Sequence, residues 1–273
     1  MGLTVFRGAS LAGSGSPDGG QDRWADCGTS AVVLDGASSF TPAVVDATHY
    51  VDQLCAELAH RLRGHEGDLV DVLGSCIAAV AGRLSLQRGQ SPSSTVLIAR
   101  ERGDNFDVLA LGDSTAVVSR NGEVDRITDD RLAAVGHDIR RQYQSRLTTG
   151  VGYDDTHRRL LRQLQEQELT ARNTSGGYWI AEADERAAEK AVLRTSPLSE
   201  VDWCVLATDG VQRPVDHLGI RWSDIAHMSA AELAELLAEL HRWEAVDDPD
   251  GIALPRSKRH DDKAVVVWTR PRL

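Results

Sequence analysis

Apolar residues in this chain gather in short runs, and several of these runs end next to an aspartate. Runs rich in Val, Leu and Ala of this length are typical of buried strands, and an Asp-Gly pair turns the chain where a strand ends. Taken alone, one such pair is more often a plain turn than a functional site. The repetition favours a shared site at the strand ends. The motifs are AVVLDG (31–36), LGDS (111–114), LATDG (206–210) and DDKAVVV (261–267).

The spacing of apolar residues elsewhere predicts the remaining elements. A capping box at Ser229 and Glu232 opens one helix, and Asn121-Gly122 is a strong hairpin turn. The expected helices are 44–63, 69–86, 156–170 and 229–243, with a short helix or turn at 183–192. The expected strands are 3–11, 31–34, 94–99, 106–111, 115–119, 124–127, 177–180, 202–207 and 264–268.

The order of these elements predicts an α+β sandwich. The strands between 94 and 127 are joined so closely that they must be antiparallel, which disfavours a parallel doubly wound sheet. The segment 128–173 is polar and basic and lacks the composition of a linker, so we expect it to be an insertion or flap on the edge of a sheet. We therefore expect a single domain over residues 1–273, long enough to bury a sizeable core.

The composition argues against several classes of binding partner. A formal net charge of −11 argues against a nucleic acid or an anionic membrane and suits a cation site. Only three of the 30 basic residues are lysines, which we attribute to codon bias. Four distant cysteines without a Cys-x-x-Cys pair predict buried free thiols and no zinc site. With no long apolar run and no basic segment before an apolar one at the N-terminus, we expect no membrane span, no signal peptide and a cytoplasmic location.

Five aspartates, spread along the chain, are the candidate metal-binding and catalytic residues. Carboxylate oxygens are the ligands that hard divalent ions prefer. Two ions that share a carboxylate can activate a water between them for attack on phosphorus. The acidic loop 247–251 is interpreted as a solvated turn, and the chain has neither a Gly-x-Ser-x-Gly elbow nor a P-loop. The pattern predicts hydrolysis of a phosphate ester by Asp22, Asp35, Asp113, Asp209 and Asp261.

The ordered set of motifs resembles the metal-dependent protein phosphatases of type 2C, over nearly the whole chain. Besides the motifs above, the resemblance includes Gln21-Asp22 and Ser94-Thr95-Val96, and the segment 172–179 resembles bacterial members. It implies a four-layer α-β-β-α sandwich, in which two antiparallel sheets are stacked face to face with helices outside. It also implies a phosphorylated protein as the substrate.

The resemblance further implies two Mn²⁺ or Mg²⁺ ions and a weaker third one. Asp35 would bridge the two ions, with the Gly36 carbonyl on one of them, and Asp35 and Asp209 are the residues expected to be catalytic. Asp209 and Asp261 would hold the first ion. The remaining candidate ligands are Asp22, on the second ion through water, and Asp113, which would hold the third ion together with Asp209.

The chain differs from the family at positions that act on the substrate phosphate and its leaving group. Family members usually have an Arg at the position of Pro17 and many have a His at the position of Ala37. Arg7 and Arg23 are the candidate substitutes for the Arg. A lone His such as His260 is more often structural than catalytic. Asp262 stands where the family commonly has Asn.

Three functions therefore remain open. The first is dephosphorylation of phosphoserine or phosphothreonine in proteins. The second keeps the metals but acts on a small phosphorylated metabolite, which the missing Arg favours. The third is a phosphatase-like binding module without turnover, which the full set of aspartates disfavours. The oligomeric state is open.

Overall fold

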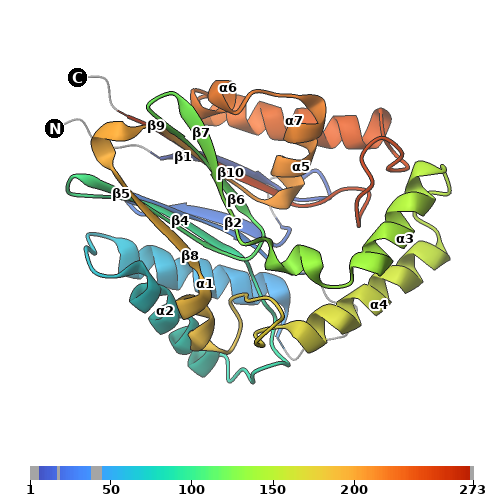
Figure 1. Ribbon diagram of the computed structural model, residues 1–273, viewed down its shortest axis with the longest axis horizontal. Coiled ribbons are helices and arrows are strands. Elements are labelled where there is room, and N and C mark those ends of the chain that lie inside the picture. Colours follow the sequence, from blue (N-terminus) through green and yellow to red (C-terminus); the bar gives the residue numbers. More distant parts are fainter. Residues whose placement is uncertain (1–5, 17–18, 38–44, 271–273) are drawn as a thin grey trace.

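The computed structural model describes residues 6–16, 19–37 and 45–270, and it contains two antiparallel five-stranded sheets (Figure 1). In the first sheet the strand order is β1 (Arg7–Leu11), β10 (Lys263–Thr269), β9 (Val201–Ala207), β6 (Thr115–Arg120) and β7 (Glu123–Ile127). In the second sheet the order is β2 (Asp22–Asp26), β3 (Ser30–Asp35), β4 (Val96–Arg102), β5 (Asn105–Leu111) and β8 (Val192–Pro197).

Helices cover the outer face of each sheet, which confirms the predicted four-layer α-β-β-α sandwich (Figure 1). The second sheet is covered by α1 (Ala47–Leu62) and α2 (Leu69–Arg83). The first sheet is covered by α5 (Asp209–Leu218), α6 (Trp222–Ala226) and α7 (Ala230–Val246). Asp46, Asp68 and Ser229 cap α1, α2 and α7 with their side chains, as helix N-termini require.

The inner strands are apolar on both faces because each lies between two hydrophobic cores. In β3, Ala31 and Val33 face the core between the sheets, whereas Val32 and Leu34 face α1 and α2. The last strand, β10, alternates in the same way, with Val266 between the sheets and Val265 under the helices. A strand buried on both faces reads as a continuous apolar run, which explains the runs in the sequence.

The predicted flap forms a pair of antiparallel helices beside the sandwich. They are α3 (His137–Thr148) and α4 (Asp155–Ala171), and Figure 1 shows them extending to one side of the two sheets. A small core of their own is formed by Tyr143, Leu147 and Leu164. The buried His157 ties α4 to the main body, since its Nε2 lies 2.8 Å from the Ser257 carbonyl oxygen.

Most of the predicted elements are confirmed, and the differences have physical reasons. The strand predicted over 177–180 is wrong, because this segment forms only isolated bridges, Arg172 with Tyr178 and Ala181 with Ser94. The helix α3 was missed because only Tyr143 and Leu147 in it are buried, which leaves no apolar stripe. Also missed were β2 and β8, in which half or more of the residues are polar, α5, whose first turn reads as the end of a strand, and the short helix α6.

The four cysteines are all buried free thiols, as predicted. Among the residues that the structure describes, no helix is long and apolar enough to cross a membrane.

A candidate active site formed by aspartates

Asp22 and Asp35 are brought together by strand pairing. They are direct partners in the antiparallel pair of β2 and β3, where Asp22 begins one strand and Asp35 ends the other. Like charges directly opposite each other destabilise a sheet. This pairing therefore costs stability unless a cation lies between the two carboxylates.

Gly36 and Thr95 hold the end of β3 in place. The Gly36 amide donates to the Gln21 carbonyl oxygen over 3.1 Å, and a Cβ at Gly36 would lie 2.8 Å from the Gln21 Cβ. Only glycine fits this approach of two backbones. The Asp35 amide donates to the Thr95 hydroxyl over 3.1 Å, and this hydroxyl lies 2.7 Å from the Ser114 hydroxyl. The end of β3 is thus connected to the turn that follows Asp113.

Asp209 and Asp261 reach the same place from the other sheet. Asp209 begins α5 directly after β9, and Asp261 lies two residues before β10. A Cβ at Gly210 would lie only 2.0 Å from the Asp262 carbonyl oxygen, so glycine lets the helix start touch the segment before β10. The first turn of a helix also favours a carboxylate, because the free amides there are partly positive.

Asp113 lies in the turn between β5 and β6, on the side of the site that faces α3 and α4. The turn depends on Gly112, whose φ of +87° is favoured by glycine and where a Cβ would lie 2.8 Å from the Thr95 Cγ2. Burial raises the pKa of Asp113 to about 7, and repulsion from Asp209 adds to the shift. The nearest groups on the flap are Arg140 and Glu168, which form an ion pair with each other over 2.5 Å.

The carboxylates lie close enough to repel one another. Burial raises the pKa of Asp35 well above its usual range, and repulsion from the other four aspartates raises it further. Burial and repulsion from Asp261 likewise raise the pKa of Asp209, whose side chain forms a hydrogen bond with that of Asp35. The structure therefore brings all five predicted aspartates to one place, with more negative charge than its own side chains neutralise.

Asp261 differs because a basic side chain accompanies it. The Lys258 ammonium lies 2.9 Å from the Asp261 Oδ1. Burial alone would raise the pKa of Asp261, but attraction to Lys258 and Lys263 and a hydrogen bond from the Asp262 amide together hold this pKa below its usual range. Sequence reasoning missed Lys258, although it is one of only three lysines in the chain.

The donor set fits a hard divalent cation. Burial, together with repulsion from Asp261, Asp262 and Asp209, raises the pKa of Asp22, while a hydrogen bond with Thr208 opposes the shift. The other oxygen of the same carboxylate, Oδ2, is buried without a hydrogen-bond partner. An orphaned buried oxygen among carboxylates of raised pKa indicates a missing positive charge. Oxygen-only donors of this kind suit Mg²⁺ or Mn²⁺.

Asp262 positions the loop that leads into β2. Its two carboxylate oxygens accept hydrogen bonds from the Gly13 amide over 2.7 Å and from the Gln21 amide over 2.6 Å. Backbone amides held in this way fix Asp22, the next residue, relative to Asp261. The sequence marked Asp262 only as a departure from Asn, so this role was not predicted.

Arg7 and Arg23 are the candidate substitutes for the Arg that binds the substrate phosphate in the family, and both are engaged by other groups. The Arg7 guanidinium donates to the carbonyl oxygens of Ala226 and Met228 at the end of α6, over 3.3 and 3.1 Å. The Arg23 guanidinium forms an ion pair with Asp52 over 2.6 Å. Pro17 lies outside the described residues.

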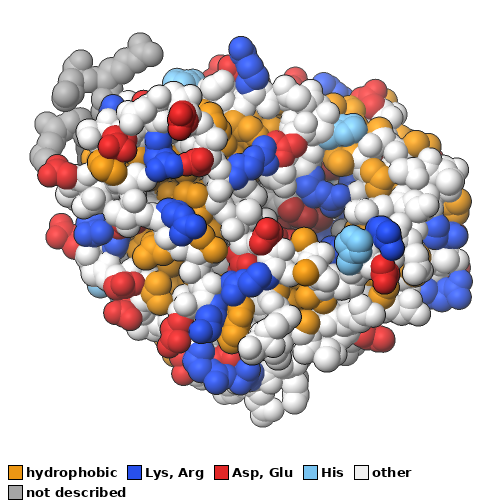
Figure 2. Space-filling view, viewed as in Figure 1, with side chains coloured by type: hydrophobic (Ala, Val, Ile, Leu, Met, Phe, Trp, Pro, Cys, Tyr) orange, Lys and Arg blue, Asp and Glu red, His pale blue; other side chains and the backbone are white. Residues whose placement is uncertain are grey.

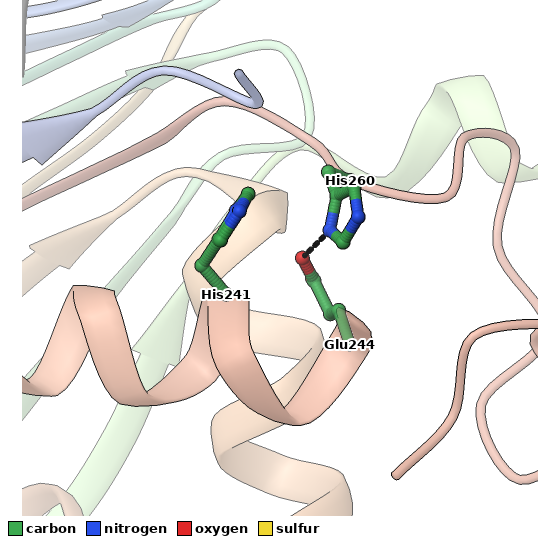
Figure 3. Close-up of side chains that lie close together, drawn as sticks. All are labelled: His241, Glu244 and His260. Carbon is green, nitrogen blue, oxygen red and sulfur yellow. Dashed lines mark hydrogen bonds and ion pairs between the residues drawn. The ribbon is translucent and has the colours of Figure 1, made fainter. Parts of the chain in front are cut away.

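A second group of ligand-type side chains lies near the end of α7 and includes the residue before Asp261 (Figure 3). One ligand atom of each of His241, Glu244 and His260 lies within 4.8 Å of the others, and among the described residues no other three such side chains are this close. No three of the five aspartate side chains therefore come this close to one another.

This second group already contains a cation. The fully buried Lys263 ammonium lies 2.8 Å from the Glu244 Oε2 and 2.9 Å from the Asp261 carbonyl oxygen. The His260 Nδ1 lies 3.4 Å from the same Glu244 oxygen, so this side of the His260 ring faces α7 (Figure 3). We conclude that the group supports the segment carrying Asp261, which agrees with the interpretation of His260 as structural.

Comparisons with known proteins agree with this geometry. Residues 7–250 match the family model for protein phosphatase 2C. No curated protein matches the chain. Among solved structures, the serine/threonine phosphatase Stp1 from Staphylococcus aureus is 14% identical, with 99% of this chain and 96% of that chain covered and a TM-score of 0.60.

Two further solved structures show the same fold. The serine/threonine phosphatase PstP/Ppp of Mycobacterium tuberculosis is 17% identical, with 99% of this chain and 100% of that chain covered and a TM-score of 0.56. The catalytic domain of the phosphatase PstP, in complex with two manganese ions, is 17% identical, with 98% of each chain covered and a TM-score of 0.54.

Proposed function

Because the chain belongs to the protein phosphatase 2C family, we propose that it hydrolyses phosphate monoesters, with phosphoserine and phosphothreonine in proteins as its substrates. The observation that supports this most directly is the cluster of five aspartates with raised or perturbed pKa values at or next to the ends of five strands. The solved structures of similar fold include bacterial serine/threonine phosphatases, one of them with two manganese ions.

We assign the ligands as follows. Asp35 is the carboxylate that repels all the others, which suits a shared position between two ions. Asp209 and Asp261 approach from the first sheet and would hold one ion, while Asp22 would hold the other. Asp113 and Asp209 are the carboxylates for a weaker third ion. The Gly36 carbonyl completes the proposed set.

Divalent cations bound there would neutralise the carboxylates and supply the Lewis acidity that phosphate-ester hydrolysis needs. The chain itself contributes rigidity. The end of β3 is fixed by Gln21 and Thr95, and the loop before β2 is fixed by Asp262. Ligands held on strand ends keep their spacing better than ligands on a long loop. We also propose that α3 and α4 form a flap of the same catalytic domain.

A second candidate is a phosphatase for small phosphorylated metabolites. The observation that favours it is that the guanidinium groups of Arg7 and Arg23 are both engaged by other partners, Arg7 by backbone carbonyls and Arg23 by Asp52. A site in which no guanidinium group contacts the phosphate binds the phosphate of a protein substrate less tightly. A small substrate held through other groups depends less on this contact.

One assay separates these functions. We expect Mn²⁺-dependent hydrolysis of both para-nitrophenyl phosphate and a phosphothreonine peptide, measured as released phosphate. Turnover of the small ester alone would favour the metabolite phosphatase. Turnover of neither substrate, with the protein folded by circular dichroism, would indicate a binding module and contradict the proposal.

The raised pKa values predict how pH acts on the metal-free protein. The carboxyls of Asp22, Asp35, Asp113 and Asp209 bind protons more tightly in the folded chain than in the unfolded chain. The stability that these protons contribute is present at low pH and is lost as pH rises through the folded pKa, which for Asp113 is about 7. With a chelator present, we expect the melting temperature to be roughly 5 °C higher at pH 6 than at pH 8.

Added Mn²⁺ should oppose this loss of stability at high pH. Cations and protons compete for the same carboxylates, so added Mn²⁺ should raise the melting temperature more at pH 8 than at pH 6. Differential scanning fluorimetry at constant ionic strength measures both effects. An equal Mn²⁺ shift at the two pH values would contradict the assignment of these groups.

A further inference from the structure

A basic pocket lies beside the flap, outside the aspartate cluster. Its volume is about 950 Å³, and its lining includes Arg88, Arg131, Arg186, Lys190, Trp179 and the backbone at Gly176. Figure 2 shows an arc of Lys and Arg side chains around a small apolar patch on the lower half of this face. The pocket is basic although the chain as a whole has a net charge of −11.

Buried carboxylates hold the guanidinium groups of this pocket in place. Asp184 is 3% exposed and forms ion pairs with both Arg88 and Arg186, over 2.9 and 2.8 Å. Asp129, also almost fully buried, forms an ion pair with Arg131. Three guanidinium groups are therefore fixed by two carboxylates. With Lys190 added and the lining Glu189 subtracted, the pocket keeps a net positive charge. Groups fixed in advance lose little conformational entropy when they bind an anion.

Each guanidinium keeps N–H groups for a ligand. Arg186 uses Nε and one terminal nitrogen on Asp184, and its side chain is 55% exposed. The Lys190 ammonium adds a fourth positive charge, 5.7 Å from the centre of the Trp179 ring. Several guanidinium groups next to an aromatic ring suit phosphate and carboxylate groups that are borne by a chain.

The pocket is connected to the aspartate cluster through short links. The Asp129 amide donates to the Gly112 carbonyl oxygen over 3.2 Å, one residue before Asp113. On the other side, the Asn173 amide donates to the Tyr178 carbonyl oxygen over 2.8 Å. Tyr178 is buried, and the next residue, Trp179, lines the pocket.

From this arrangement we propose that the pocket binds an acidic segment of the phosphoprotein substrate, one that carries carboxylates or a second phosphate near the phosphate to be removed. The proposal rests on the proposed function and adds a substrate preference to it. The negative charge of the chain repels acidic substrates elsewhere. The pocket supplies the attraction that a peptide phosphate does not receive from Arg7 or Arg23.

The test compares phosphothreonine peptides with and without a run of three glutamates, joined through Gly-Ser linkers of several lengths. In the wild-type chain we expect a higher kcat/KM for one or more of the acidic peptides. Lys190→Glu should lower that value roughly fivefold to tenfold. It should leave para-nitrophenyl phosphate and the neutral peptide unchanged. Arg221→Glu is the matched control, because Arg221 is 77% exposed and lies next to α6, on the opposite sheet.

Binding of the same peptides, with a fluorescent label, separates failure of this proposal from failure of the proposed function. If Lys190→Glu binds the acidic peptide more weakly and the wild type shows no turnover, the result would support the proposed pocket and contradict the proposed phosphatase activity. Equal binding and equal kcat/KM in wild type and Lys190→Glu would contradict the proposal that the pocket binds an acidic segment. Displacement of the peptide by inorganic phosphate at the peptide's own concentration would also overturn it, in favour of a small-anion site.

Discussion

Asp35→Asn is expected to lower the Mn²⁺-dependent kcat on para-nitrophenyl phosphate by about 100-fold or more, while the metal-free protein becomes more resistant to heat. Both effects have one cause. The Asp35 carboxylate is repelled by the other four aspartates, so removing its charge relieves the metal-free fold. The same change removes the carboxylate that we assign to both ions. The new amide can still donate a hydrogen bond to Asp209, and so the strand end should stay in place.

The measurements are steady-state kinetics and melting temperatures with a chelator and with Mn²⁺. Asp138→Asn is the matched control, because that carboxylate is 80% exposed on α3 and belongs to none of the proposed ligands. The control should match the wild type in both assays. Near-normal turnover in Asp35→Asn would remove the mechanism. A lower metal-free melting temperature would show that Asp35 is structural.

The apolar runs predicted the central strands because both faces of these strands are buried, whereas the four layers were predicted from the family resemblance. Continuous apolar runs such as 31–34 and 264–268 are typical of strands that are covered on both faces. The edge strand β8 could not be predicted from its residues, since Arg194 and Thr195 are exposed and give no apolar pattern. Its pairing with β5 is a tertiary event that periodicity does not encode.

Four of the five aspartates were predictable because each follows or precedes an apolar run, whereas Asp22 was predicted from its place before the Asp35 strand and from the family resemblance. The side chains that position them were not, because their role depends on contacts far along the chain. Asp262 binds the amide of Gln21, which is 241 positions away. The lysines offered a signal that was read as codon bias. Lys258 accompanies Asp261, Lys263 is buried against Glu244, and Lys190 lies in the basic pocket.

Lys263→Met is expected to destabilise the fold by about 3–5 kcal/mol, because it leaves the buried Glu244 carboxylate without its cation. Burial already raises the pKa of Glu244, while attraction to Lys263 opposes the shift. Without Lys263 this pKa should rise further, and the carboxyl then takes up a proton. The loss of stability should therefore be larger at pH 8 than at pH 5. A fall in melting temperature of about 10 °C at pH 8 is the expected size.

The double variant Glu244→Gln and Lys263→Met separates charge from packing. Removing both charges leaves no uncompensated ion, so the double variant should be more stable than Lys263→Met alone. The double variant still lacks the 2.9 Å hydrogen bond from the Lys263 ammonium to the Asp261 carbonyl oxygen. We therefore expect it to need a higher Mn²⁺ concentration for half-maximal activity. If the double variant is as unstable as Lys263→Met, packing and not the ion pair governs this position; if it needs no more Mn²⁺ than the wild type, Lys263 does not position Asp261.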